Sequence, residues 1–262
     1  MQRWLLLAAI LAGCGNVQSP ATDGPPPRDL LTGTLRNGCV VALHMDEESW
    51  TGAPGEVKDD CGNDNPGTVN GQGTTTVAGG VSGRAGSFSG AACIDIPDAT
   101  TLHGTTGLTL SAWILPTRLN NGDNANGVIS KRNGRGDQPE YSLSVWQANN
   151  VYVDLDGEDT EFHSLAVITE RTWQQLTMVY DGTRLQDQRA RIYVNGSLDT
   201  TGSELSSPLT AYTSPLHIGC MPAPTATPPD LQHFFGEIDE VVIWNRALSD
   251  AEITQWYMNT KP

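Results

Sequence analysis

Short runs of β-branched and aromatic residues recur along this chain, separated by the turn-favouring residues glycine, asparagine, aspartate and proline. Many runs alternate apolar and polar residues, as residues 108–113 (LTLSAW) do, which is typical of a strand with one buried face. We expect strands at residues 40–45, 93–96, 108–115, 128–131, 141–146, 151–155, 162–168, 173–180, 191–194, 216–220 and 237–244. So many short strands predict an all-β fold built as a sandwich.

Two dipeptides predict tight turns between strands. Asn195-Gly196 stands between two apolar runs, and both residues suit the positive φ that a type I′ hairpin turn requires. Asp181-Gly182 follows another run and has the same turn character. Both dipeptides favour antiparallel neighbours.

The end of the chain has the one segment with a helical pattern. Ser249 is placed to cap a helix, and Glu252 stands three residues later, as in a capping box. Ile253, Trp256 and Tyr257 form an apolar stripe. We therefore expect a short C-terminal helix that packs across one end of the sandwich.

Several segments together resemble one known family. They are residues 86–90 leading into 94–97, then 108–114, 129–131, 173–182, 192–196, 216–219 and the closing run 235–249. In order and spacing they are similar to the laminin G-like jelly rolls of the concanavalin A-like lectin and glucanase superfamily, over about residues 40–258. The resemblance implies two antiparallel sheets in a jelly-roll β-sandwich, with the first and last strands near one another. It does not imply one ligand.

The first residues resemble an export signal. Arg3 precedes an apolar run at residues 4–12, which is too short to cross a bilayer because a spanning helix needs about 20 apolar residues. The run closes on Leu11-Ala12-Gly13-Cys14, which resembles the lipobox of bacterial lipoprotein signal peptides. This resemblance implies that residues 1–13 are removed and that Cys14 carries the acyl chains. The alternative is an ordinary secretory signal in which Cys14 is incidental.

These expectations divide the chain into three parts. Residues 1–13 are the signal, residues 14–37 are the lipidated cysteine and a linker rich in proline and glycine, and residues 38–262 are one laminin G-like domain. Two or more acyl chains hold a protein stably on a membrane. We therefore expect an exported protein that its lipid anchors to the bacterial cell envelope, at the outer membrane.

Charge limits the partners. The chain has 30 acidic and 15 basic residues, for a formal net charge of −15. An acidic protein repels phosphate backbones, and no basic patch interleaved with aromatic residues offsets this, so we expect no nucleic-acid partner. Divalent cations are more compatible with this charge.

Four cysteines remain after Cys14, namely Cys39, Cys61, Cys93 and Cys220. An even number in an exported chain predicts two disulfides, and four cysteines allow three pairings. We favour Cys39 with Cys61 and Cys93 with Cys220, because the first pair brackets one strand and its loop. A zinc site is the competing interpretation, but no CxxC or HxxxH spacing supports it.

Asp239 and Asp46 are candidate ligands of a structural calcium ion. By strand parity Asp239 falls on the apolar face with Val241 and Ile243, and a carboxylate on a buried face must be paired or coordinated. Several relatives of the fold bind calcium, a hard ion that takes oxygen ligands. If the first and last strands are adjacent, Asp46 and Asp239 can share one ion. The alternative is that Asp239 only accepts hydrogen bonds from loop amides.

The sequence contains part of a catalytic motif. The β-glucan hydrolases of the same superfamily carry two glutamates on one strand with an aspartate between them, so that both carboxylates face one cleft. Residues 237–241 (EIDEV) begin this pattern, but Val241 stands where the second glutamate is needed, and Glu240 points to the opposite face. We therefore expect no enzyme activity.

The ligand-binding residues cannot be assigned from the sequence. Aromatic residues that can present a flat face to a sugar are Trp50, Trp146 and Tyr152, and those expected to fill the core are Trp113, Trp173 and Trp244. The leading hypothesis is a noncatalytic recognition domain on the cell envelope that binds a polysaccharide or a protein ligand. The alternatives are a structural or assembly component of the envelope and a glycan hydrolase.

Overall fold

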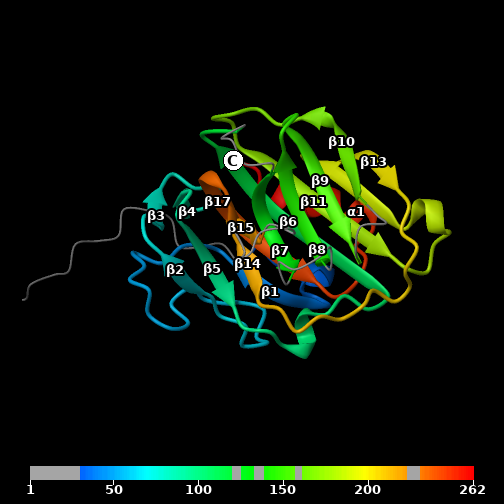
Figure 1. Cartoon of the computed structure of the whole chain (residues 1–262), viewed down its shortest axis with the longest axis horizontal. Helices are drawn as coiled ribbons and strands as arrows, with labels where there is room; N and C mark the ends of the chain where they lie inside the picture. The colour runs from blue at the N-terminus through cyan, green and yellow to red at the C-terminus, as the bar shows by residue number, and fades with distance from the viewer. Residues whose placement is uncertain (1–29, 120–124, 133–138, 157–160, 223–230) are drawn as a thin grey trace, which may run out of the picture.

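The computed structural model describes residues 30–119, 125–132, 139–156, 161–222 and 231–262. Two antiparallel sheets pack face to face in a jelly-roll β-sandwich, which confirms the fold class expected from the sequence (Figure 1). A two-stranded ribbon and one helix complete the domain. Within the described ranges, no helix has the length and apolar character needed to cross a bilayer.

The eight-stranded sheet has the order β13-β12-β11-β6-β17-β4-β3, and β1 also pairs with β17. Its strands are β1 (Cys39–Leu43), β3 (Thr75–Ala78), β4 (Arg84–Ser89), β6 (Gly107–Pro116), β11 (Gln174–Asp181), β12 (Ala190–Val194), β13 (Ser197–Gly202) and β17 (Phe235–Trp244). This sheet carries the first and the last strand of the domain side by side, as the family resemblance implies.

The seven-stranded sheet has the order β10-β9-β8-β7-β14-β5-β2. Its strands are β2 (Thr68–Gly71), β5 (Ala92–Ile96), β7 (Ala125–Arg132), β8 (Pro139–Trp146), β9 (Asn150–Leu155), β10 (Glu161–Val167) and β14 (Leu216–Ile218). The ribbon and the helical elements are β15 (Cys220–Pro222), β16 (Leu231–His233), α1 (Asp250–Thr260) and the 3-10 turns η1 (Gly33–Arg36), η2 (Thr100–Leu102) and η3 (Gln186–Gln188).

Two apolar clusters hold these layers together. The larger one fills the space between the sheets with residues such as Leu110, Ile129 and Leu143. The smaller one lies on the outer face of the eight-stranded sheet and includes Val242 and Trp244. Burial of this apolar surface is the main favourable contribution to folding.

Four tryptophans differ in how well their burial agrees with the sequence prediction. Trp113 and Trp244 are buried, as expected, whereas Trp173 is only half-buried. Trp50, a candidate for sugar stacking, instead belongs to the core between the sheets and is 7% exposed. The sequence prediction was therefore wrong for Trp50 and Trp173.

The C-terminal helix forms where expected but packs elsewhere. Ser249 and Glu252 make the predicted capping box at the start of α1. The indole Nε1 of Trp256 donates to Ser111 Oγ of β6 at 3.1 Å, and Tyr257 stacks on Trp113 with ring centroids 5.6 Å apart. The helix thus covers the outer face of the eight-stranded sheet instead of one end of the sandwich.

The folded domain begins earlier than residue 38. Leu30, Leu31 and Leu35 are buried in the smaller apolar cluster. The indole Nε1 of Trp244 donates to the carbonyl oxygen of Leu35 at 2.6 Å. Residues 30–37, predicted to be linker, are therefore part of the domain, whereas Cys14 and the predicted signal lie outside the described residues.

Turn geometry agrees in part with the sequence. Asn195 and Gly196 have φ values of 51° and 73° and join β12 to β13, as a type I′ turn requires. Asp181-Gly182 does not make a tight hairpin, because residues 182–189 separate β11 from β12. The predicted strand at residues 216–220 is two strands, since Gly219 adopts φ 79° and turns β15 away from β14.

Candidate functional site

A row of polar residues crosses the outer face of the seven-stranded sheet. Directly paired residues on antiparallel strands point to the same face, and this pairing continues from β2 through β5, β14, β7 and β8 to β9. The residues of this polar row are Thr68, Asp95, His217, Ser130, Ser142 and Asp154. Their chain neighbours Ile94, Ile129 and Leu143 lie in the core, so the polar row faces away from it.

Three serines lie at the centre of this face. Ser130 and Ser142 belong to the polar row, and Ser144 follows Ser142 by two residues in β8 and so lies on the same face. All three side chains are buried, at 0% exposure, and none of their hydroxyls has a hydrogen-bond partner among the residues that the structure describes. A buried hydroxyl without a partner costs about 1–3 kcal/mol. Such groups require an explanation, and a ligand or water that bonds to them is one.

One end of the polar row is a hydrogen-bonded network. Asp95 Oδ1 lies 2.7 Å from His217 Nδ1, and its Oδ2 accepts from Asn70 Nδ2 at 2.8 Å. Burial alone would raise the pKa of Asp95, but these hydrogen bonds outweigh it and the pKa is lowered. The carboxylate is therefore charged and fixed in orientation.

The other end of the polar row carries a cation and an aromatic group. Arg132 Nη1 lies 3.3 Å from Asp154 Oδ2. Trp146 stacks on Tyr152 with ring centroids 4.9 Å apart, and the ring of His163 lies 5.4 Å from that of Tyr152. Tyr152 is paired with both Ser144 and His163, which places the aromatic group beside the serines on the same face. Trp146 is half-buried, whereas Tyr152 is buried beneath it at 5% exposure, so of these two candidates only Trp146 has an exposed part for sugar stacking.

A second cluster, of acidic residues, occupies the point where β17 changes neighbours. Residues 235–238 of β17 pair with β4, residues 241–244 pair with β1, and Asp239 and Glu240 lie between. Asp239 is fully buried, and its Oδ2 accepts from the backbone N–H groups of Val81 and Ser82 at 2.7 and 3.2 Å. Its Oδ1 accepts from the N–H of Glu240 at 2.8 Å.

Asp239 lies on a different face from the one predicted. It pairs with Trp113, whose ring stacks on α1, so both side chains belong to the outer face of the eight-stranded sheet. Val241 and Ile243 belong to the core. The parity argument was wrong because β17 has a bulge between Asp239 and Val242, with Glu240 at φ 49°.

Asp46 and Asp239 both contact the segment that leads from β3 into β4. Asp46 Oδ1 accepts from the backbone N–H of Arg84 at 2.7 Å, and a Cβ on Gly83 would lie 2.2 Å from that oxygen. A Cβ on Gly80 would lie 2.7 Å from Asp239 Oδ2. The loop from β3 to β4 therefore packs closely on both carboxylates.

These acidic residues offer the hard oxygen ligands that calcium takes, and they are short of positive charge. Burial raises the pKa values of Asp46 and Glu240 and raises that of Asp239 far above its ordinary range. Asp239 accepts hydrogen bonds from loop amides, which is the alternative to calcium binding that the sequence left open. The oxygen donors are of the type that calcium takes, but among the described residues they do not form a group of three ligand atoms within 4.8 Å of one another. The imidazole of His44 is a nearby cation for Glu240 and Asp46.

Two disulfides are present, and they join Cys39 to Cys61 and Cys93 to Cys220. This is the pairing favoured from the sequence. Each bond connects a strand of one sheet to a later segment, because Cys39 begins β1 and Cys93 lies in β5.

The glucanase-like segment does not assemble a pair of carboxylates on one cleft. Glu237 is half-buried on β17, where burial raises its pKa, and it pairs with Leu115. Val241 occupies the position of the second glutamate and points into the core. In this segment, the geometry that a retaining or inverting hydrolase needs is therefore incomplete.

Comparisons with known proteins agree with this architecture. A family model described as the concanavalin A-like lectin/glucanases superfamily matches residues 88–254. Domain 4 of AbnA, a GH43 extracellular arabinanase from Geobacillus stearothermophilus solved in complex with arabinotriose, is 20% identical with a TM-score of 0.61. The match covers 84% of this chain and 98% of that domain. No curated protein matches the chain.

Toxin binding domains share the fold as well. The binding domain of Paraclostridial Mosquitocidal Protein 1 is 16% identical with a TM-score of 0.62, over 85% of this chain and 52% of that one. A structure of botulinum neurotoxin type C, whose cell entry depends on two ganglioside molecules, is 11% identical with a TM-score of 0.61, over 87% and 52%. The chain spans about half the length of these toxin structures.

Proposed function

Because the chain belongs to the concanavalin A-like lectin/glucanases superfamily, we propose that it is a noncatalytic binding protein that recognises a neutral polysaccharide on the outer face of its seven-stranded sheet. The observation that carries this proposal is the group of three buried serine hydroxyls, Ser130, Ser142 and Ser144, for which the described part of the chain offers no hydrogen-bond partner. Sugar hydroxyls both donate and accept, and they suit such positions.

The neighbouring groups support a sugar as the ligand. Trp146, half-buried and stacked on the buried Tyr152, presents a ring beside the serines, and aromatic faces pack on the apolar faces of sugar rings. Asp95 and Asp154 add fixed carboxylates at the two ends of the polar row. Most sites for small ligands combine such an apolar surface with a few oriented polar groups.

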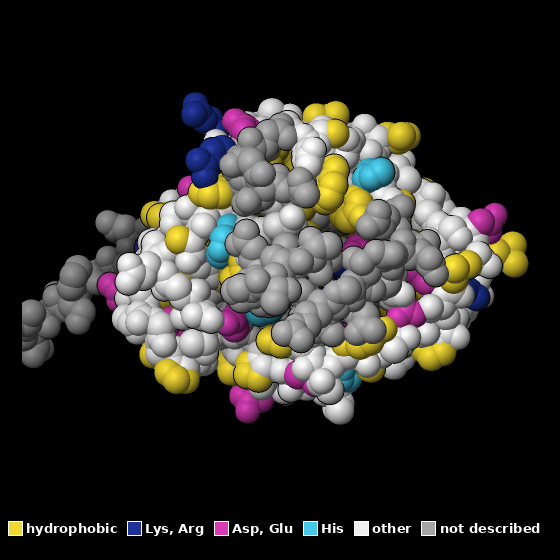
Figure 2. Space-filling model, viewed as in Figure 1, with side chains coloured by type: hydrophobic (Ala, Val, Ile, Leu, Met, Phe, Trp, Pro, Cys, Tyr) yellow, Lys and Arg dark blue, Asp and Glu magenta, His cyan; other side chains and the backbone are white. Residues whose placement is uncertain are grey.

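Charge argues for an uncharged ligand. The net charge is −15, and lysine and arginine are few on the described surface of this face (Figure 2). An acidic polysaccharide would therefore be repelled at long range. Arabinotriose, bound by the domain of the arabinanase, is a neutral sugar of the class that we propose.

We also propose that one calcium ion stabilises the acidic cluster. Asp46 and Asp239 would hold it, and the ion would add positive charge beside carboxyl groups whose burial raises their pKa values. Its role would be structural, because the cluster lies on the eight-stranded sheet and not on the sheet with the serines.

The proposed cellular location rests on the sequence motif at Cys14. We propose that Cys14 carries acyl chains and anchors the exported domain to the bacterial cell envelope. Two disulfides agree with an oxidising compartment. Labelled palmitate that appears on the wild-type chain and is absent from Cys14→Ser would support the anchor, and equal labelling of both would exclude it.

A glycan array tests the binding function. The proposal predicts that the purified protein binds neutral polysaccharides and does not hydrolyse them. Binding only to protein partners would favour the assembly alternative, and release of reducing sugar at an enzymatic rate would favour a hydrolase.

A further inference from the structure

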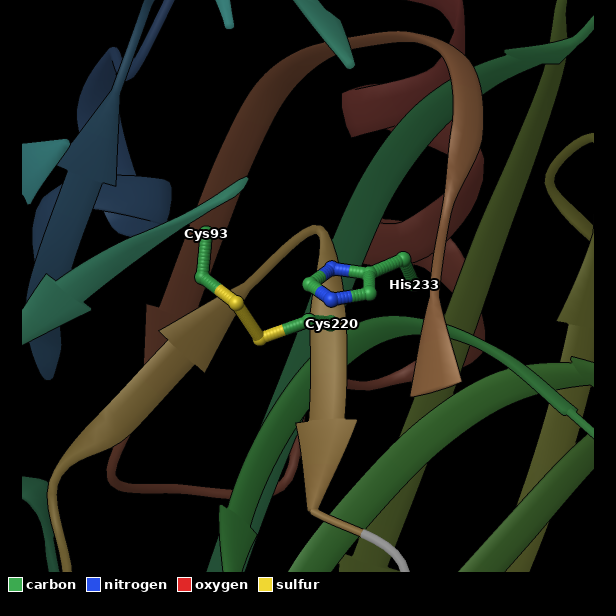
Figure 3. Close-up of side chains that lie close together, drawn as sticks. All are labelled: Cys93, Cys220 and His233. Carbon is green, nitrogen blue, oxygen red and sulfur yellow. A yellow bond between two sulfur atoms is a disulfide. The ribbon is translucent and has the colours of Figure 1, made fainter. Parts of the chain in front are cut away.

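The two-stranded ribbon brings a histidine beside one of the disulfides. Cys220 and His233 are directly paired across β15 and β16, so their side chains point to the same face. Cys220 is bonded to Cys93 of β5, and Figure 3 shows the imidazole of His233 next to this disulfide. One ligand atom from each of the three residues lies within 4.8 Å of the other two.

We propose that the dithiol form of this protein binds a thiophilic metal ion, such as Zn²⁺, through Cys93, Cys220 and His233. In a tetrahedral site with Zn–S near 2.3 Å and Zn–N near 2.0 Å, donor atoms lie roughly 3.5–3.8 Å apart. The three donors already lie within a slightly larger distance of each other, so small rotations of the side chains suffice once the sulfurs are no longer bonded. Two thiolates and one imidazole are a common zinc ligand set.

The strands hold these positions independently of the disulfide. β5 pairs with both β2 and β14, and β15 pairs with β16. The ribbon also lies directly on β7, because a Cβ on Gly127 would come 2.4 Å from the carbonyl carbon of Cys220. Opening the disulfide therefore leaves three ligands on a backbone that other contacts fix.

Burial and access favour a bound ion. Cys93 and Cys220 are 3% and 0% exposed, whereas His233 is half-buried and provides the route for an ion from solvent. A buried pair of thiolates requires a compensating positive charge, which a divalent ion supplies. Water would complete the fourth coordination position, as it does in zinc sites with three protein ligands.

The chemistry needs one reductant. A dithiol reduces the Cys93–Cys220 disulfide to two thiols and becomes a disulfide itself, and a phosphine with one water gives the same two thiols and a phosphine oxide. Zn²⁺ then displaces two protons from these thiols, while neutral His233 donates a ring nitrogen. The sequence raised a zinc site as an alternative to the disulfides. The ligands proposed here could not be recognised from local spacing, because Cys93 and Cys220 are 127 residues apart.

The other disulfide provides a matched control. Among the residues that the structure describes, no third histidine, cysteine, aspartate or glutamate completes a comparable group with Cys39 and Cys61. Reduction of that bond alone should create no site. The double variant Cys39→Ser/Cys61→Ser should therefore still bind one ion per chain after reduction.

Zinc titration of the full chain before and after treatment with a phosphine reductant tests the proposal. We expect no stoichiometric binding to the oxidised form and one Zn²⁺ per chain in the reduced form. Co²⁺ should give thiolate-to-cobalt charge-transfer absorption. His233→Ala should weaken binding by more than about tenfold, since even the loss of a hydrogen bond to a metal ligand costs about that much.

Folding must be followed in parallel. His233→Ala keeps the disulfide, so its oxidised form should melt like the wild type, and a loss of binding then reports the ligand itself. Absence of stoichiometric zinc in the reduced wild type, unchanged affinity in His233→Ala, or a reduced chain that unfolds and does not recover with zinc would each overturn the proposal.

Discussion

His44 and Glu240 form a buried ion pair where β17 exchanges β4 for β1, with His44 Nδ1 2.8 Å from Glu240 Oε2. The side chains are 15% and 1% exposed. Glu240 reaches His44 from a left-handed backbone position, φ 49°, inside a strand. Positive φ at a residue other than glycine costs of order 1 kcal/mol, and such strain persists where other contacts impose it.

This pair predicts how stability depends on pH. Burial alone would lower the pKa of His44, but the hydrogen bond and charge of Glu240 outweigh it and raise the pKa from 6.5 to about 9. The folded state therefore binds this proton more tightly than the unfolded state. The resulting stabilisation is complete below pH 6.5 and is lost as pH rises through about 9.

Denaturant unfolding at a series of pH values measures this effect. The free energy of unfolding should fall by roughly 1–3 kcal/mol between about pH 6.5 and 9 in the wild type, and His44→Gln should remove this component. His163→Gln, at an exposed histidine, is the control and should keep it. An identical slope in His44→Gln and the wild type would contradict the assignment.

Asp239→Asn should destabilise the protein by about 2 kcal/mol or more. Both carboxylate oxygens accept backbone N–H groups, so the amide nitrogen would face a donor in either orientation. Asp199 also accepts two backbone N–H groups, from Leu165 and Ala166, but is more exposed. Asp199→Asn should therefore cost less, and equal losses in the two variants would be inconsistent with the buried site described for Asp239.

Calcium should raise the melting temperature of the wild type, and a chelator should reverse the increase. A ligand that binds only the folded state stabilises it by mass action. The increase should grow as pH rises, because the pKa values of Asp46 and Asp239 are raised and protonated carboxyl groups do not bind the ion. Asp46→Asn should lose the increase, and if calcium stabilised this variant as much as the wild type, the proposed ion would lie elsewhere.

Trp146→Ala should weaken polysaccharide binding by about 1 kcal/mol, roughly fivefold, through the loss of stacking. Trp173 is also half-buried but immediately precedes β11 in the other sheet. Trp173→Ala should therefore leave the affinity unchanged. Isothermal titration calorimetry compares the two variants, and a larger loss in Trp173→Ala would place the ligand on the wrong sheet.

The sequence predicts the strands that have a buried, alternating face. β6, β8 and β11 fall within two residues of their expected ranges, and α1 begins at its predicted cap. The strands β2 and β3 were not predicted, because threonine, asparagine and glycine make them short and partly exposed. Leu30 and Leu31 were placed in a linker because the residues around them are polar or proline.

The candidate sites were harder to predict, because long-range pairing creates them. One bulged residue in β17 reverses the face of Asp239, and a count of alternate residues cannot include it. Ser142 and Ser144 occupy polar positions of an alternating strand, where sequence indicates exposure to solvent, yet both are buried. His233 gains significance only because the ribbon places it opposite Cys220.

Calorimetric titration of neutral polysaccharides, arabinan among them, into the wild type and into Ser130→Ala/Ser142→Ala tests the central claim most directly. The double variant should be at least as stable as the wild type, because it removes buried hydroxyls that have no hydrogen-bond partner among the described residues, yet bind about tenfold more weakly or worse. Ser111 supplies the control, because this buried serine lies in the eight-stranded sheet and its hydroxyl is hydrogen-bonded to that of Thr177. Ser111→Ala should lose stability and keep the affinity for the polysaccharide. Two results would contradict the account. One is a wild type that binds none of these polysaccharides, and the other is a double variant that binds one of them as tightly as the wild type does.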